Sequence, residues 1–285
     1  MHAVLADLIQ VLQLEKLEHN LFRGVSRDLG FPQVFGGQVL GQSLAATCAT
    51  VRPDRSVHSL HAYFLLPGDV TAPIIYEVDR SRDGGSFSSR RVVAIQHGQP
   101  IFHMSASFQV EQAGFEHQSS MPHVPRPEDL PDLRHLVAQS TEVPAELKTW
   151  FEIPLPIEFR AVNAEQLMSA DPSEASTQFW FRAVDALPND AVLHRCVLAY
   201  ASDFYLLRTS TQPHGIAFPS AQLRLASIDH AMWFHRPLRV DEWLLYCIDS
   251  PSASSARGLS RGAIYDQAGT LVASVAQEGL IRYTP

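Results

Sequence analysis

The segment Val57-His58-Ser59-Leu60-His61-Ala62-Tyr63-Phe64, which continues to Pro67, has a counterpart in Ser227-Ile228-Asp229-His230-Ala231-Met232-Trp233-Phe234, which continues to Pro237. In each half a serine-rich segment follows, at residues 86–91 and 252–257, and then a strand-like segment at 101–109 and 271–279. Each last segment comes after a glycine turn, His97-Gly98 or Ala268-Gly269. Three segments in one order, repeated at a spacing of about 170 positions, indicate a duplicated domain.

The bulk composition is consistent with two packed units. A chain of 285 residues with 46% hydrophobic residues exceeds the usual size of one core and can fill two. A net charge of −8 without a block rich in Lys and Arg argues against a nucleic-acid partner. An anionic ligand would therefore need individually placed cations, for which Arg90, Arg91 and Arg257 are the candidates.

The amino terminus predicts an amphipathic helix, because its apolar residues at positions 5, 8, 9 and 12 follow helical spacing and no basic region precedes them. No apolar run reaches the length of about 18 residues that a membrane span requires, so no span is expected. The three cysteines, Cys48, Cys196 and Cys247, are odd in number and lie among apolar residues. Buried free thiols in a reducing cytoplasm are the expectation.

Local patterns predict an α+β fold built from two repeats, residues 1–115 and 148–285, joined by a proline-rich linker at 116–147 that carries one short helix near 133–139. One long helix is expected from Gly36-Gly37-Gln38 and another after Asn189-Asp190, a good N-cap pair. Strands near 74–79, 87–96 and 101–110 complete an antiparallel sheet in the first repeat.

Three polar residues of the second repeat interrupt faces that periodicity assigns to the core. Asp203 lies close to the apolar stripe of the second helix, Ser227 follows Leu223 and Leu225 on one strand face, and Gln277 continues an alternating apolar row. Aligning the prolines places Val57 opposite Ser227 and Ser107 opposite Gln277. Each residue also has a structural explanation, as a cap, a small strand residue or a residue at the sheet rim.

Five segments carry a family resemblance: VFGGQV (34–39), HSLHAYF (58–64), FSSRRV (87–92), IDHAMWFHRP (228–237) and SASSARG (252–258). Over about residues 8 to 283 the chain resembles the type II acyl-CoA thioesterases. The resemblance implies a double hotdog, hydrolysis of fatty acyl-CoA to free acid and CoA, and a homo-oligomer, with a tetramer as the family-based expectation. It also implies a catalytic Asp, Thr and Gln, which fall on Asp203, Ser227 and Gln277. Serine at the threonine position keeps the hydroxyl but loses the methyl group that restrains χ1.

This trio suits hydrolysis by water. Asp203 can act as general base while Ser227 and Gln277 orient the water, so neither a covalent acyl-enzyme nor a metal or organic cofactor is expected. A helix amino terminus is the natural source of donors for the thioester oxyanion, and the sequence leaves open which helix supplies it. Further candidates for substrate contact are Gly36 and Gly37, His58, and the three arginines.

Competing interpretations remain open. Gly258-Leu259-Ser260-Arg261-Gly262 matches the G-x-S-x-G nucleophile elbow, but a strand rather than a helix is expected after it. His58 and His61 match no metal spacing and are expected on opposite strand faces. A hotdog enoyl-CoA hydratase would use the same acyl-CoA partner, and a non-catalytic acyl-CoA-binding module is the third possibility.

Overall fold

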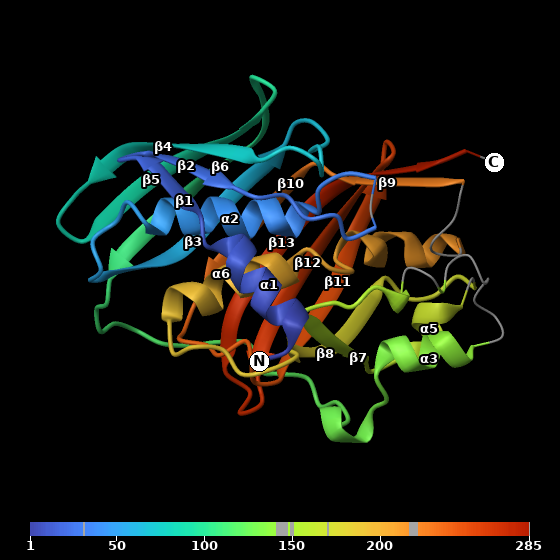
Figure 1. The fold of residues 1–285 in the computed structure, drawn as a ribbon. Coiled ribbons are helices and arrows are strands. Elements are labelled where there is room, and N and C mark those ends of the chain that lie inside the picture. Colours follow the sequence, from blue (N-terminus) through green and yellow to red (C-terminus); the bar gives the residue numbers. More distant parts are fainter. Residues whose placement is uncertain (31, 141–147, 149–150, 170, 217–221, 285) are drawn as a thin grey trace.

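The computed structural model describes residues 1–30, 32–140, 148, 151–169, 171–216 and 222–284 (Figure 1). The helices are α1 (Ala3–Leu12), α2 (Gly36–Cys48), α3 (Leu133–Gln139), α5 (Ala164–Met168) and α6 (Ala191–Ser202), with 3-10 segments η1 (Pro127–Asp129) and η2 (Leu207–His214). The strands are β1 (Glu15–Glu18), β2 (Leu21–Gly24), β3 (Arg55–Phe64), β4 (Ile74–Asp83), β5 (Phe87–Gln96), β6 (Gln99–Val110), β7 (Ile157–Ala161), β8 (Ser176–Ala183), β9 (Leu223–Ser227), β10 (Asp229–Phe234), β11 (Leu244–Ser254), β12 (Arg257–Asp266) and β13 (Leu271–Tyr283).

The strands form one antiparallel sheet in the order β1-β2-β4-β5-β6-β3-β10-β13-β12-β11-β8-β7, with β9 attached to β13. The order β4-β5-β6-β3 in one half is mirrored by β10-β13-β12-β11 in the other, and the halves meet where β3 pairs with β10, with His61 opposite Ala231. Figure 1 shows α2 and α6 together on one face of the curved sheet, with α1 lying across them. This arrangement confirms the expected α+β double hotdog.

The two central helices begin differently. Asp190 caps α6 by accepting hydrogen bonds from the backbone N–H groups of Val192 and Leu193, whereas Phe35 at the start of α2 supplies no side-chain cap. The Phe35 carbonyl accepts from the Gln38 N–H at 3.0 Å, so the N–H groups of Gly36 and Gly37 are the two first-turn donors that no side chain of the N-cap satisfies. Both helices start where the sequence predicts.

Close packing of α2 against α6 requires glycine on the shared face. A Cβ at Gly37 would lie 2.3 Å from the carbonyl oxygen of Tyr200, and one at Gly41 would lie 3.1 Å from that of Cys196. Residues four apart share a helix face, so the pair forms a smooth strip along which the helix backbones approach each other.

The linker crosses the outer face of the second half-sheet. The indole N–H of Trp180 donates to the carbonyl of Pro125 at 2.9 Å, and Met121 and Val124 pack on a cluster that contains Trp243. The short helix expected near 133–139 is confirmed as α3. The division into units 1–115 and 148–285 stays a prediction, and linker residues 141–147 lie outside the described residues.

Two details of the sequence comparison were wrong. Residues 252–257 are not one strand, because Ser255 and Ala256 have positive φ and form the turn between β11 and β12. The proposed match of 86–91 with 252–257 therefore fails, and Arg257 corresponds to Phe87 as the first residue of its strand.

A β-bulge between Val57 and Ser59 overturns the expectation that His58 and His61 lie on opposite faces. His58 contacts Ser107 and Phe87, which belong to the outer face of the sheet, and His61 contacts Trp233 on the same face. The bulge inserts one residue and so shifts the alternation.

No helix among the described residues is long and apolar enough to span a membrane. All three cysteines are free, with Cys196 buried and the thiols at 48 and 247 half-buried.

Candidate active site

Asp203 occupies the C-cap position of α6, and its side chain is only 6% exposed. Gln277 reaches it from the inner face of β13, with Nε2 donating to Asp203 Oδ1 at 2.8 Å. The same nitrogen donates to Ser227 Oγ at 2.9 Å from the end of β9, and the Ser227 hydroxyl donates to the Asp203 carboxylate. The structure thus brings together the three residues that the sequence selected.

The orientation of the Gln277 amide is fixed by chemistry. A carboxylate only accepts hydrogen bonds, so the NH₂ group must face Asp203, and its two hydrogens are used by Asp203 and Ser227. The other amide atom, Oε1, is buried without a hydrogen-bond partner among the described residues. A buried acceptor without a partner is costly unless a donor such as water or substrate satisfies it.

The amino terminus of α2 abuts the same carboxylate. The Gly37 N–H donates to Asp203, and a Cβ at Gly36 would lie 2.7 Å from Asp203 Oδ2 and 3.0 Å from the ring of Phe64. An anionic group at a helix amino terminus is stabilised by the free N–H groups and the helix dipole. The seam between the repeats therefore joins the start of α2 to the end of α6.

Burial raises the pKa of the Asp203 carboxyl above its usual range, while hydrogen bonds from Gln277, Gly37 and Ser227 oppose the rise. Desolvation disfavours the charged form, so the carboxylate holds a proton more tightly than an exposed one does. A carboxylate of raised proton affinity is a better general base.

The row of inner-face residues beside Asp203 differs between the repeats. In the second repeat Ser260 on β12 faces Gln277, and His230 precedes Ala231, which pairs with Ala276, so the row reads His230, Gln277, Ser260. In the first repeat the equivalent row reads Leu60, Ala106, Arg90. Ala106, and not Ser107, is thus the counterpart of Gln277, because the chain between the paired residues Ser260 and Gln277 is one residue longer than the chain between Arg90 and Ala106.

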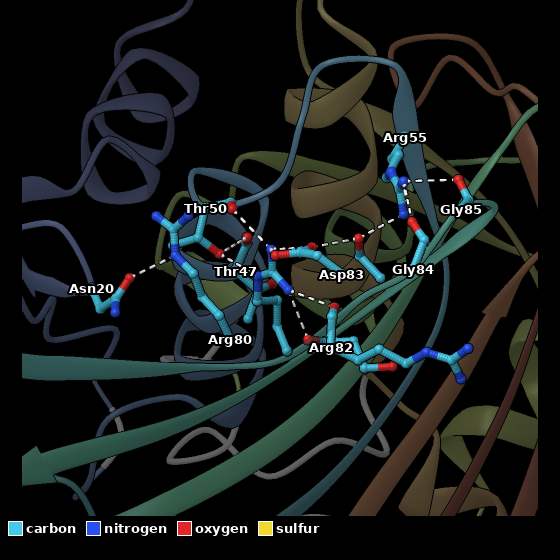
Figure 2. A network of polar contacts seen from close by, with 12 residues as sticks. Asn20, Thr47, Thr50, Arg55, Arg80, Arg82, Asp83, Gly84 and Gly85 are labelled. Atoms are coloured by element: carbon cyan, nitrogen blue, oxygen red, sulfur yellow. Dashed lines mark hydrogen bonds and ion pairs between the residues drawn. The ribbon is translucent and has the colours of Figure 1, made fainter.

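Arg90 is not a surface cation but a buried one, 2% exposed. Its guanidinium donates to Thr50, to the carbonyls of Arg82 and Ser89, and to both oxygens of Asp83. Figure 2 shows the surrounding network, in which Thr50, Asp83 and Arg55 lie close together. Because these bonds occupy all five N–H donors, the expected contact with a CoA phosphate is corrected to a structural role at the carboxyl end of α2.

The other predicted contact residues lie apart from the trio. Arg91 is exposed on the outer face of β5, opposite Asp79. Arg257 forms an ion pair with Glu278 at 2.9 Å and lines a cavity of about 490 Å³ together with Ile281. His58 Nε2 lies 2.8 Å from Ser107 Oγ on the outer face.

Ser260 lies within a continuous strand, since β12 runs from Arg257 to Asp266 and leads into β13 without a helix. The strand, turn and helix of a nucleophile elbow are absent from this described segment.

Sequence reasoning missed His230, which is fully buried with Nδ1 3.9 Å from Asp203 Oδ1. Its spacing of two and four residues before Met232 and Phe234, both buried, is a signal that could have found it.

The site and fold have clear relatives. Residues 147–280 match the family model described as "Acyl-CoA thioesterase", and residues 27–109 match "Acyl-CoA thioesterase N-terminal domain". The chain is 44% identical over 287 residues to acyl-CoA thioesterase 2 of Haemophilus influenzae, covering 100% of both chains. It is 42% identical to human acyl-coenzyme A thioesterase 8, covering 96% of this chain and 88% of that protein.

Solved structures of similar sequence belong to the same class of thioesterase. The crystal structure of acyl-CoA thioesterase II TesB2 from Mycobacterium marinum is 46% identical, with a TM-score of 0.81 over 97% of this chain and 98% of that chain. A TesB protein from Mycobacterium avium is 28% identical, with a TM-score of 0.82 over 99% of this chain and 100% of that chain. Full-length identity at this level, together with the double hotdog and the carboxylate at its seam, shows that the chain belongs to the acyl-CoA thioesterase family and is a thioester hydrolase.

Proposed function

We propose that the protein hydrolyses fatty acyl-CoA with a water molecule held by Asp203, Ser227 and Gln277. One observation carries this proposal: a single amide nitrogen of Gln277 donates to both Asp203 and Ser227 and leaves Oε1 as a buried acceptor. A water that donates one hydrogen to the Asp203 carboxylate and the other to this oxygen would have its oxygen lone pairs free for attack.

In the proposed reaction the water oxygen forms a bond to the thioester carbon as Asp203 takes a proton from the water. The carbonyl oxygen becomes an oxyanion, which the Gly36 N–H at the start of α2 stabilises, since the Gly37 N–H donates to Asp203 and the Gln38 N–H to the Phe35 carbonyl. Collapse of the tetrahedral intermediate breaks the carbon–sulfur bond, and the proton held by Asp203 passes to the CoA sulfur. The products are a fatty acid and CoA, and the carboxylate is regenerated without any redox change.

The test compares variants in an assay of CoA release monitored with a thiol reagent. Asp203→Asn removes the base but keeps the size of the side chain, so turnover should fall by about 10²–10⁴-fold while binding persists. Gln277→Ala should also reduce turnover, because the Asp203 orientation and the buried acceptor are both lost. Ser274→Ala, on the outer side of the same strand, is the matched control. An active Asp203→Asn variant that is folded by circular dichroism would refute the mechanism.

Five further residues are proposed to contact the substrate. Gly36 and Gly37 lie at the α2 terminus and are proposed to let the thioester carbonyl approach the backbone. Arg257 is supported by its position on the 490 Å³ cavity, and Arg91 and His58 by their exposure or half-exposure. Arg257→Ala should raise KM for acyl-CoA without lowering kcat if the arginine binds a phosphate.

We also infer that the protein is a homo-oligomer, with a tetramer as the expected form, and that it acts in the cytoplasm. The outer sheet face supports association, since Tyr63 and Trp233 expose 49% and 36% of their surfaces. The three free thiols are consistent with a reducing compartment. A monomer by light scattering at micromolar concentration would contradict the first inference, and recovery of the protein outside the cytoplasm in cell fractionation would contradict the second.

A further inference from the structure

His230 is a fully buried histidine whose two ring nitrogens have very different surroundings. Nε2 lies 3.0 Å from Ser202 Oγ, while Nδ1 has no hydrogen-bond partner among the described residues. Nδ1 lies 3.9 Å from Asp203 Oδ1, which is beyond hydrogen-bond length. A buried polar atom without a partner in a folded core calls for a physical reason.

The hydrogen bond from Ser202 to the Ala199 carbonyl fixes the tautomer of the His230 ring. The Ser202 hydroxyl has one hydrogen, which it donates to the carbonyl of Ala199 at 2.9 Å. Its oxygen must then accept from His230, so Nε2 carries the ring hydrogen. In a neutral ring the other nitrogen is an acceptor, and Nδ1 therefore presents a lone pair to the carboxylate.

We propose that His230 is a positioning residue for catalysis, which acts by raising the proton affinity of Asp203 through the lone pair of Nδ1. This inference rests on the proposed function, in which Asp203 is the general base. An ionised Asp203 has no hydrogen to share with Nδ1, so two electron-rich atoms face each other. A protonated Asp203 can donate its O–H to Nδ1 after a small movement. His230 therefore favours the protonated form of Asp203, which is the form that results when Asp203 takes a proton from the water, over the ionised form.

The ring stays neutral over the working range of pH, since burial lowers the pKa of His230 to about 3. A protonated ring would donate to the carboxylate and weaken the base. The low pKa keeps the ring neutral, and the contact with Ser202 selects the tautomer of that neutral ring.

The other elements packed around Asp203 bring few titratable groups. β11 contributes Tyr246, which donates to the carbonyl of Ser202 at 3.0 Å and whose pKa burial raises well above its usual range. The contacts from α2, β9 and β13 come from neutral groups, namely the Gly37 N–H, Ser227 and Gln277. Asp229, the sequence neighbour of His230, accepts instead from the Glu278 N–H at 2.7 Å. His230 is thus the group that distinguishes the two protonation states of Asp203.

The experiment measures the pH dependence of kcat for hydrolysis of palmitoyl-CoA. His230→Gln keeps a donor near the Nε2 position but removes the Nδ1 lone pair, and we expect its acid limb to move to lower pH and its plateau to fall by about threefold to tenfold. Ser202→Ala frees the ring to adopt the other tautomer, in which Nδ1–H donates to Asp203. Its acid limb should move in the same direction, although the partners of the Ser202 hydroxyl among the described residues are the Ala199 carbonyl and His230 and not the carboxylate. Met232→Leu, two residues along the same inner face, should leave the profile unchanged.

The outcomes separate the two proposals. An inactive Asp203→Asn beside folded His230→Gln and Ser202→Ala variants with unshifted acid limbs would overturn this inference and leave the general-base mechanism standing. An active Asp203→Asn would overturn the mechanism itself. If His230→Gln does not fold, the pH profile of Ser202→Ala alone tests the inference. If His230 has only a structural role, Ser202→Ala should lower the thermal stability without shifting the acid limb.

Discussion

Gly36 lies against the carboxylate of Asp203, so closely that a Cβ at position 36 would come within 2.7 Å of Oδ2. The contact joins the first residue of α2 to the last cap residue of α6, across the seam between the repeats. A methyl group there must displace the carboxylate or the ring of Phe64, which would be 3.0 Å away.

We therefore expect Gly36→Ala to lower kcat by about 10-fold to 100-fold, because a displacement of the order of 1 Å at a catalytic group has effects of this size. Gly37→Ala is the informative comparison, since its Cβ would lie 2.3 Å from the backbone of Tyr200. Overpacking of this kind costs about 1–3 kcal/mol of folding free energy. Kinetics and thermal melts of both variants check the contrast. A Gly36→Ala enzyme with normal kcat would show that the carboxylate has room to move.

Ser227 should be replaceable by threonine but not by alanine. The hydroxyl accepts from Gln277 at 2.9 Å and donates to Asp203, and Thr keeps both functions. We expect Ser227→Thr to retain kcat within a few-fold and Ser227→Ala to lose about 10-fold or more, in line with the loss of one orienting hydrogen bond. Equal activity of the two variants would separate the hydroxyl from catalysis.

The raised pKa of Asp203 predicts a pH-dependent cost to stability. The unfolded carboxyl ionises near its usual value while the folded one still holds its proton, so the folded state binds more protons in the window between the two values. The free energy of unfolding of the wild type should fall as pH rises through that window. Asp203→Asn lacks this titration, and its stability relative to the wild type should therefore increase from pH 3 to neutral pH. Denaturant titrations at several pH values measure the difference; a difference that is constant with pH would contradict the raised pKa.

Ser260→Ala should keep most of the activity. Ser260 Oγ is fully buried and lacks a hydrogen-bond partner among the described residues, so no base within that region activates it as a nucleophile. Loss of CoA release in a folded Ser260→Ala variant, beside an active Asp203→Asn, would reinstate the G-x-S-x-G interpretation.

Chelation should leave turnover unchanged. In the proposed mechanism the carboxylate of Asp203 activates the water directly, Gln277 Oε1 accepts the second hydrogen of the water, and Ser227 orients Gln277 by a hydrogen bond. CoA release is measured before and after incubation with EDTA. Full loss of activity and its rescue by zinc would require a different mechanism.

The sequence predicted the helix starts and several strands because these are encoded locally, and it singled out three polar residues that the structure brings together. Asp203, Ser227 and Gln277 stand out as polar interruptions of apolar patterns, and such patterns depend only on helix and strand periods. Arg90 alternates with Ser88 and Val92, which are both buried, but its charge led to the prediction of a contact with an anionic ligand.

Other features depend on register, which no local pattern reveals. The bulge beside His58 shifts the alternation along β3, and the longer connection before β13 shifts the second repeat by one residue. The counterpart of Gln277 therefore changes from Ser107 to Ala106. The approach of His230 to Asp203 likewise arises only when β10 and the end of α6 meet in three dimensions.

The Arg90 network has an evolutionary consequence. Two identical subunits must carry the same residues at both ends of their shared helix pair, so neither end can be optimised alone. A fused chain is free of that constraint: here one end keeps a carboxylate under desolvation, while the other is filled by an arginine bound to Asp83 and Thr50. Gene fusion thus permits a division of labour, in which one end of the helix pair holds the buried carboxylate and the other end holds a fully hydrogen-bonded arginine.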